Sequence, residues 1–227
     1  MNFLQNVELW VDTEDNPNIL KYSIPYFHIF AGSSVNEGIE EMFTLVPERH
    51  QFIFPNQSWE RVAKEYWGKK LYSYTRQKFN PKNIDLESIQ TFAKKKLQDN
   101  FKISEIDIET VCYIDKKISN YFSLYYDGPK VFMAKGVGYC IKDGNELASF
   151  ATAFLPFRKN LEIQVITLEK YRRKGLALIA CTKLIEYCLV NSITPCWDAA
   201  NENSVKLALK LGYTNPISYQ CYYWKKD

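Results

Sequence analysis

A short basic run, Arg172-Arg-Lys-Gly-Leu-Ala177, has the residue types and spacing to bind a phosphate group. It follows an apolar run with strand-like alternation (residues 161–167) and precedes a long apolar stretch with helical spacing (residues 176–190). The start of a helix offers backbone N–H groups and a partial positive charge to an anion, and three neighbouring cations add to that attraction. The run therefore predicts a site for a phosphorylated cofactor.

Gly175 allows the backbone of this turn to approach a ligand closely. Without a Cβ, the backbone at Gly175 can come within hydrogen-bond distance of a pyrophosphate, and the small Ala177 leaves the first helical turn open. A nucleotide P-loop is excluded because it requires Gly-x4-Gly-Lys-Ser/Thr, whereas Lys174 precedes the glycine here. A dinucleotide fingerprint is excluded because it requires three spaced glycines. The alternative to a cofactor site is an ordinary strand-turn-helix connection.

A second block, residues 201–213, reads Asn-Glu-Asn-Ser-Val-Lys-Leu-Ala-Leu-Lys-Leu-Gly-Tyr. Asn201 or Asn203 can cap a helix, and Gly212 suits the left-handed backbone position that ends one. Taken alone, this pattern is typical of any capped amphipathic helix. Its position, one predicted strand after the basic run, is what gives it functional meaning.

The two blocks, in this order, resemble the signatures of the GNAT (Gcn5-related) N-acetyltransferases. Arg172, Gly175 and Ala177 match the family's Arg/Gln-x-x-Gly-x-Gly/Ala turn, and residues 201–213 match Asn-x-x-Ala/Ser-x-x-Leu-x-x-Lys-x-Gly-Phe/Tyr. Three longer runs are similar to the bacterial branch that includes the zwittermicin A resistance type acetyltransferases: Gly136-Val-Gly-Tyr-Cys, Tyr171-Arg-Arg-Lys-Gly-Leu-Ala and Cys196-Trp-Asp-Ala-Ala-Asn-Glu-Asn-Ser-Val-Lys-Leu-Ala. The resemblance implies that acetyl-CoA is the cosubstrate, without a metal, and that a small-molecule amine attacks it directly in a ternary complex.

The resemblance also implies where the cofactor lies. In this family the strand before the turn splays from its parallel neighbour, and the pantetheine arm lies in the gap. A backbone N–H on that strand would stabilise the oxyanion. The expected cofactor-binding residues are Val165, Ile166, Thr167, Arg172, Arg173, Lys174, Gly175, Leu176, Ala177, Asn201 and Ser204.

Two carboxylates are candidates for the catalytic base. An alkyl amine has a pKa of about 10, so its attack as a neutral amine requires a base or a water chain. Glu162 shares a strand face with Gln164 and is the carboxylate nearest to the expected thioester. Asp198, beside Trp197 on the neighbouring strand, is the rival, and either residue could instead be purely structural.

The general acid is left unassigned. Many members of the family carry a tyrosine seven residues after the motif asparagine, and that position is Ala208 here. Tyr213, Tyr222 and Ser204 cannot be ranked from the sequence. The thiolate of CoA, with a pKa near 8.5, is a fair leaving group without help, so the alanine does not exclude activity.

The elements around these residues predict a mixed α/β fold, and the resemblance implies the GNAT fold, with splayed parallel strands flanked by helices. The expected order is strands over 136–141, 146–154 and 161–167, a helix over 176–190, a strand over 195–199, a helix within 201–213 and a strand over 219–224. Lys142-Asp-Gly-Asn145 is typical of a hairpin turn. A helix crosses between the strands over 161–167 and 195–199, which should therefore be parallel.

A small N-terminal α/β unit is expected over residues 1–80, before an acetyltransferase domain over residues 81–227. Its predicted elements are strands over 10–11, 19–30, 51–54 and 71–79 and a helix over 59–67. After the boundary, a helix over 86–98 capped by Asp85 and a strand over 101–108 are expected.

Composition excludes several classes of protein. The N-terminus lacks a basic and apolar leader, and no run reaches about 18 apolar residues, so we expect no signal peptide, no membrane span and a cytoplasmic location. A net charge of +3 does not indicate a nucleic-acid partner. The six cysteines and two histidines lack metal-ligand spacing, so we expect the cysteines to be reduced thiols. The expected oligomeric state is a monomer or homodimer. The alternative function is a non-catalytic acyl-CoA-binding protein with a regulatory or partner-binding role.

Overall fold

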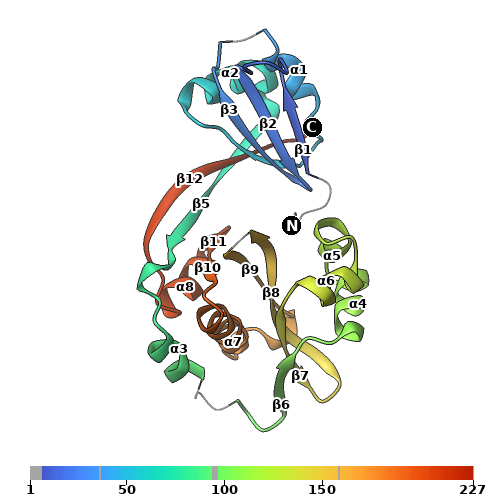
Figure 1. Cartoon of the computed structure of the whole chain (residues 1–227), viewed down its shortest axis with the longest axis vertical. Coiled ribbons are helices and arrows are strands. Elements are labelled where there is room, and N and C mark those ends of the chain that lie inside the picture. The colour runs from blue at the N-terminus through green and yellow to red at the C-terminus, as the bar shows by residue number, and fades with distance from the viewer. Residues whose placement is uncertain (1–6, 36, 94–96, 158, 227) are drawn as a thin grey trace. The chain divides into compact units, whose positions relative to one another are not determined.

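The computed structural model describes residues 7–35, 37–93, 97–157 and 159–226, and its elements are labelled in Figure 1. The strands are β1 (Glu8–Val11), β2 (Ile19–Ile24), β3 (Phe27–Gly32), β4 (Gln51–Ile53), β5 (Leu71–Asn80), β6 (Phe101–Glu105), β7 (Gly138–Asp143), β8 (Glu146–Phe157), β9 (Asn160–Thr167), β10 (Thr194–Cys196), β11 (Asp198–Ala199) and β12 (Thr214–Trp224). The helices are α1 (Ile39–Thr44), α2 (Gln57–Trp67), α3 (Leu86–Ala93), α4 (Ile108–Lys117), α5 (Tyr121–Tyr125), α6 (Pro129–Lys135), α7 (Leu176–Val190) and α8 (Glu202–Lys210). Three 3-10 turns are η1 (Gly68–Lys70), η2 (Pro81–Asn83) and η3 (Glu169–Tyr171).

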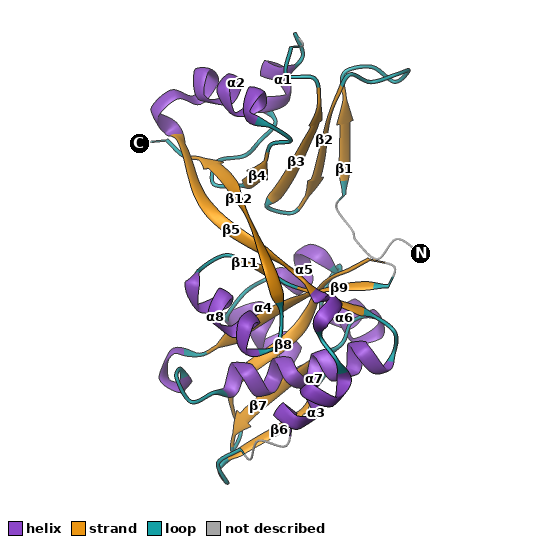
Figure 2. Ribbon diagram, turned by 90° about the vertical axis from the view of Figure 1, so that its left-hand side faces the viewer, coloured by secondary structure: helices purple, strands orange, loops and turns teal. Residues whose placement is uncertain are grey.

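One compact unit consists of residues 7–76 and 218–226. Its strands follow the order β1-β2-β3-β4-β12-β5, with β3 parallel to β4 (Figure 2). α2 is amphipathic and begins after Asn56, whose side chain accepts hydrogen bonds from two first-turn N–H groups. Its Trp59 packs with Phe30 and Phe43 in an aromatic core, at ring-centroid distances of 5.6 and 6.2 Å. Burial of these large rings holds α1 and α2 against one face of the sheet.

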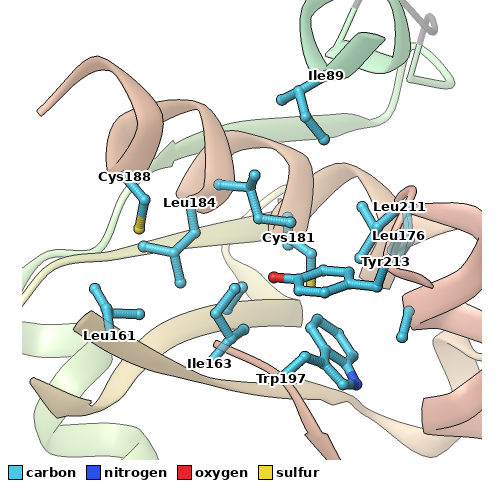
Figure 3. Packing of buried hydrophobic residues seen from close by; sticks show 14 of the residues in the cluster. Ile89, Leu161, Ile163, Leu176, Cys181, Leu184, Cys188, Trp197, Leu211 and Tyr213 are labelled. Carbon is cyan, nitrogen blue, oxygen red and sulfur yellow. The ribbon is translucent and has the colours of Figure 1, made fainter. Parts of the chain in front are cut away.

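The other unit consists of residues 77–217 and contains a sheet of order β10-β9-β8-β7-β6. β6 to β9 are antiparallel, with the predicted hairpin turn joining β7 to β8, and β10 is parallel to β9, as predicted. α7 is apolar nearly all round and packs on one face, where Cys181, Leu184 and Cys188 point toward Leu161 and Ile163 of β9 (Figure 3). α5 contacts the other face, where the Tyr121 hydroxyl donates to Thr152 Oγ1 at 2.5 Å. The mixed α/β fold predicted from the sequence is confirmed.

Two predicted strands are each interrupted in the structure. The strand predicted over residues 19–30 is two strands, β2 and β3, joined by a tight turn at Pro25 and Tyr26. Tyr26 has a φ of 60°, a left-handed conformation that a tyrosine does not signal in a sequence. The strand predicted over residues 195–199 breaks at Trp197 into β10 and β11, which pair with different strands.

Sequence analysis missed four helices, α1 and α4 to α6. α4 begins after Asp107, whose carboxylate caps the first turn by accepting the Thr110 N–H at 2.7 Å. Val111 and Ile114 lie three residues apart on its buried face. These capping and spacing signals are present in the sequence and could have identified the helix.

Two elements near the predicted boundary are shorter than expected. The helix predicted over residues 86–98 begins after Asp85, which caps it as predicted, and α3 ends at Ala93. Residues 94–96 of that predicted helix lie outside the described residues. The strand predicted over residues 101–108 ends earlier, at the close of β6, because α4 begins at its far end.

The contacts divide the chain at a different place from the sequence-based boundary after residue 80. They group residues 218–226 with residues 7–76, whereas the sequence assigned the whole C-terminus to one domain. β12 accounts for this grouping, because Tyr222 pairs with Phe52 of β4. The functional roles assigned to the two sequence-based domains stay predictions.

Three properties of the described residues bear on function. All six cysteines are free thiols, and Cys140, Cys181, Cys188 and Cys221 are buried. Within the described part of the chain, no helix is long and apolar enough to cross a membrane. The same residues contain no group of three or more His, Cys, Asp or Glu side chains placed to hold a metal ion.

The two histidines, far apart in sequence, meet inside the first unit. His28 Nε2 lies 3.0 Å from His50 Nδ1, and His28 Nδ1 lies 2.9 Å from Ser23 Oγ. His28 is buried, and burial, together with the charges of Lys21 and His50, lowers its pKa to about 3. His28 is therefore neutral in the folded protein at pH values where an unfolded histidine, with a pKa of 6.5, is already protonated.

Acid is expected to destabilise this unit through His28. Below about pH 6.5 this histidine binds a proton in the unfolded chain, whereas in the folded chain it binds one only near pH 3. The contribution of His28 to the free energy of unfolding is therefore full above pH 6.5 and falls as the pH decreases toward 3. For one proton the free energy of unfolding should fall by about 1.4 kcal/mol per pH unit. Denaturant unfolding from pH 7 to 4.5 measures this slope. His28→Gln should flatten it more than His50→Gln, and equal slopes in all three proteins would contradict the assignment.

Candidate active site

β9 and β10 diverge after three paired residues. β10 runs parallel to β9 from Thr194 opposite Asn160 to Cys196 opposite Glu162. Two residues later the chain turns to another partner, because Asp198 pairs antiparallel with Lys78 of β5. No strand among the described residues covers the edge of β9 beyond Glu162. A parallel pair therefore opens into a gap at this point.

Glu162 lies at the point of divergence. Its carboxylate Oε1 accepts the backbone N–H of Asp198 at 2.9 Å, a charge-assisted bond that spans the opening. Between the two short strands, Trp197 is buried and its indole N–H donates to Ser204 Oγ at 3.1 Å. The buried Tyr213 hydroxyl donates to the Pro195 carbonyl at 3.0 Å. These contacts hold the bend, so Glu162 has a structural contact in addition to any chemical role.

The uncovered edge of β9 presents backbone groups of alternate residues. The Leu168 N–H donates to the Ala148 carbonyl at 2.9 Å. Hydrogen bonds between antiparallel strands involve every second residue, so the residues of β9 that bond to β8 alternate, counted back from Leu168. Val165 and Thr167 consequently direct their backbone groups to the open edge. Ile166 bonds the other way, and its carbonyl also accepts the Ser149 hydroxyl at 3.0 Å. An extended ligand with amide groups could pair with Val165 and Thr167 as an added strand.

The N-terminus of α7 begins at Gly175. This residue is the N-cap, with φ of 78° and ψ of 5°, and no side chain of the described residues caps the helix. A Cβ placed on Gly175 would meet nothing within 4 Å, so the space in front of the first turn is open. Leu176 is buried and can contribute only its backbone, whereas Ala177 is partly exposed. The uncapped N–H groups and the helix dipole suit an anion.

The three cations of the turn lie at the surface around this helix start. Arg172, Arg173 and Lys174 are all exposed. Arg172 Nε donates to the Thr167 carbonyl at 3.4 Å, which connects the turn to the open edge of β9. The Lys174 ammonium lies over the rings of Phe101 and Tyr171, 5.5 and 5.4 Å from their centroids. Arg172 therefore holds positive charge at the end of the gap, whereas Lys174 lies against Tyr171 and Phe101 of β6.

Asn201 and Ser204 have local structural contacts. Asn201 Oδ1 accepts the Ser204 N–H at 3.0 Å and caps α8, as the sequence predicted. Ser204 Oγ accepts the Trp197 indole N–H. Asn201 is exposed, so its amide N–H groups remain at the surface. Contact between these two residues and a cofactor stays a prediction.

A buried acceptor atom lies on the same strand as Glu162. Gln164 Oε1 is shielded from solvent and has no hydrogen-bond partner within the described residues. Its cross-strand neighbour is Thr152, which accepts the Tyr121 hydroxyl. An unpaired buried acceptor costs about 1–3 kcal/mol, so this position suits a ligand that donates an N–H. Sequence analysis missed Tyr121 and Thr152 because no motif marks them and α5 was not predicted.

The three candidates for the general acid are all engaged elsewhere. Tyr213 is 1% exposed and its hydroxyl bonds to the Pro195 carbonyl. Ser204 accepts from Trp197. Tyr222 belongs to the other unit, where burial and the nearby Glu60 raise its pKa to about 12. Ala208 is fully buried, and the general acid remains unassigned.

Comparison with known proteins assigns this geometry to a family. A model of the GNAT acetyltransferases matches residues 5–222. The chain belongs to the GNAT acetyltransferase family. It is 28% identical over 203 residues to the uncharacterized N-acetyltransferase YdfB of Bacillus subtilis (strain 168), spanning 87% of this chain and 72% of YdfB. The family assignment and this relative identify an N-acetyltransferase.

Solved structures agree with the GNAT assignment over both units. A GCN5-related N-acetyltransferase-like protein from Streptococcus suis 89/1591 has a TM-score of 0.85 at 26% identity, over 96% of this chain and 88% of that chain. A tandem GNAT protein from the clavulanic acid biosynthesis pathway has a TM-score of 0.58 at 8% identity, over 100% of this chain and 85% of that chain. The second likeness shows the fold alone. Both extend over the N-terminal unit, which therefore belongs to the shared fold.

Proposed function

We propose that this GNAT enzyme transfers the acetyl group of acetyl-CoA to an amine of a small molecule, by direct attack in a ternary complex. The observation that carries the proposal is the gap that opens between β9 and β10 at Glu162 and leads along β9 to the uncapped start of α7 at Gly175. A strand edge suits the amides of a pantetheine arm, and an uncapped helix start suits a pyrophosphate. The strand edge is followed by the helix start, just as the pantetheine arm is followed by the pyrophosphate along one acyl-CoA molecule.

The residues of the gap would hold the cosubstrate by its charge and its amides. When bound, acetyl-CoA supplies the activated acetyl group. Arg172, Arg173 and Lys174 complement the negative phosphates, and the first N–H groups of α7 donate to their oxygens. The backbone of Val165 and Thr167 binds the extended arm and fixes the position of the thioester. Ile166, whose carbonyl is bonded toward β8, contributes the side chain rather than the backbone.

Glu162 and Asp198 are the proposed carriers of the amine proton. Both lie where β9 and β10 separate, next to the edge that positions the thioester. A carboxylate accepts hydrogen bonds at about four lone-pair sites, so the bond from Asp198 N–H to Glu162 is compatible with a further contact to an amine. Holding amine and thioester together contributes roughly 7 kcal/mol or more when alignment is good.

Release of CoA with a panel of amines tests the proposal. Incubation with acetyl-CoA and single primary amines should release free CoA faster than acetyl-CoA alone, and mass spectrometry should show the acetylated amine. Initial rates with both substrates varied should give intersecting lines, as a ternary complex requires. Parallel lines would indicate an acetyl-enzyme and contradict direct attack. The small-molecule acceptor, the resemblance to the zwittermicin A resistance branch, the cytoplasmic location and the monomer or homodimer stay predictions.

Gln164→Met is expected to raise the stability of the protein and to lower its activity toward the amine. Methionine fills a similar volume without an unpaired acceptor, so the melting temperature should rise by about 2–4 °C for each 1 kcal/mol recovered. If Gln164 Oε1 accepts an N–H of the acceptor, kcat/KM for the amine should fall about tenfold with acetyl-CoA affinity unchanged. Gln220→Met is the matched control, because that amide is exposed and donates to Thr75 Oγ1 at 3.0 Å. A lower melting temperature with unchanged kcat/KM would refute this role.

A further inference from the structure

An open pocket of about 460 Å³ lies on the face of the N-terminal sheet opposite α1 and α2. Its lining residues are Arg49, Gln51, Tyr74, Tyr223 and Lys225. Gln51 and Tyr223 are register partners across β4 and β12, so both project from the same face. Their neighbours Phe52 and Tyr222 point to the aromatic core on the other side. The volume lies in the range of small-molecule sites, about 300–1,000 Å³.

A chain of hydrogen bonds orients one donor into this pocket. Arg76 Nη1 donates to the Tyr74 hydroxyl at 3.3 Å, and that hydroxyl donates to Gln51 Oε1 at 2.7 Å. Burial raises the pKa of Tyr74 to about 12, which keeps the phenol protonated as a donor. Because Gln51 Oε1 accepts in this chain, the amide group presents its N–H donors on the opposite side. The direction of these hydrogen bonds thus leaves the amide N–H groups of Gln51 to donate to an acceptor atom of a ligand.

Two cations are held next to each other by the backbone. The Arg49 N–H donates to the Trp224 carbonyl at 2.8 Å, and the next residue, Lys225, donates its N–H to the Lys70 carbonyl at 3.1 Å. Arg49 has a left-handed φ of 65°, which directs the chain sharply at this point. Arg49 Nε lies 3.7 Å from Glu48 Oε1, an ion pair at the surface and of small energetic value. Among the described residues that line the pocket there is no carboxylate, so an anion would meet the charges of Arg49 and Lys225 without a competing negative group in the lining.

Aromatic rings form the wall beside these charges. Tyr223 stacks on Tyr72 with ring centroids 5.4 Å apart and an interplanar angle of 16°. The Lys225 ammonium lies over the Tyr72 ring, 4.6 Å from its centroid, which fixes the position of that charge. Tyr74 lies at 57° to Tyr223 with centroids 6.4 Å apart. The pocket therefore combines a flat apolar surface with donors of hydrogen bonds and positive charge.

We infer that this pocket binds a small organic oxyanion, a carboxylate or a phosphate, that carries an aromatic ring. The oxyanion contacts Arg49, Lys225 and the Gln51 amide, and the ring packs against Tyr223. The acetyl-transfer proposal uses none of these residues, so the two can fail separately.

Four small probes with one ring and different charges test the inference. Benzoate, phenyl phosphate, benzyl alcohol and benzylamine are titrated into the full-length protein and followed by ligand-observed NMR and calorimetry. Benzoate or phenyl phosphate should bind at least tenfold more tightly than benzyl alcohol, and benzylamine should not bind. The tighter of the two anions distinguishes a carboxylate site from a phosphate site. Equal binding of anion and alcohol, or no binding of any probe below about 10 mM, would overturn the inference.

Lys225→Met and its neighbour Lys226→Met form a matched pair. Both remove one positive charge, but Lys225 lines the pocket and Lys226 is exposed outside it. Lys225→Met and Gln51→Glu should each weaken the anionic probe about tenfold, whereas Lys226→Met should leave it unchanged. Equal losses in both lysine variants would indicate nonspecific attraction and reject the site. Melting temperatures verify that each variant is folded.

The start of α7 is a second place where an anion could bind, and one variant separates the two. Gly175→Trp should leave benzoate and phenyl phosphate binding unchanged if they occupy the pocket. Loss of probe binding in Gly175→Trp, with Lys225→Met unaffected, would place the anion at α7 and refute the inference.

Discussion

Gly175→Trp is expected to reduce acetyl-CoA affinity at least a hundredfold, below detection by calorimetry. The indole would occupy the open space before α7, where a Cβ meets no atom within 4 Å, and would cover the N–H groups that suit a pyrophosphate. A charge-assisted hydrogen bond contributes roughly 1.5–3 kcal/mol, so loss of two such contacts accounts for the effect. Unchanged affinity would mean that the cofactor binds elsewhere.

Two controls separate blockage from backbone strain. Gly175→Ala carries the cost of a left-handed Cβ, about 1–2 kcal/mol, without the bulk, and should bind acetyl-CoA within a few fold of the parent. Gly144→Trp places the same side chain at a hairpin turn with φ of 58° and open space. It should lose similar stability and retain full affinity. If Gly144→Trp also lost acetyl-CoA binding, general destabilisation would explain the result at Gly175.

Glu162→Gln is expected to lower kcat about a hundredfold or more, the usual scale for loss of a general base. Glutamine keeps an oxygen that can accept the Asp198 N–H, so the bend between β10 and β11 should survive. Acetyl-CoA affinity should therefore stay unchanged, and the rising limb of the pH profile should move or disappear. Glu105→Gln, an exposed glutamate on β6, is the matched control and should change nothing.

The same measurements on Asp198→Asn decide between the two carboxylates. Whichever variant loses turnover while keeping acetyl-CoA affinity identifies the base. Glu162→Leu adds a structural comparison, since it removes both the charge and the bond to Asp198 N–H and should lower the melting temperature as well. Wild-type pH profiles in both Glu162→Gln and Asp198→Asn would reject the pair and favour a water chain.

Local sequence patterns predicted the helix bounds and caps that depend only on residues close together in the chain. The helix predicted over residues 176–190 has the bounds of α7, because its apolar run is long and a glycine marks its start. The cap at Asn201 and the left-handed Gly212 after α8 follow from the same short-range rules. Helices α4 to α6 were missed because no motif drew attention to them, although the Asp107 cap was readable.

The sequence alone determined the position of the basic glycine-bearing turn, its order relative to the second block and, through these, the resemblance to the family that the family model confirms. Only the tertiary structure decided that the strand over residues 195–199 breaks at Trp197, because the break depends on β5 and on the Glu162 carboxylate, both distant in sequence. It also left Gln164 Oε1 without a hydrogen-bond partner among the described residues, which depends on every atom around that oxygen. Spacing along the chain fixes helix starts and turns, whereas the opening of a sheet and the pairing of buried polar atoms arise from contacts between distant segments.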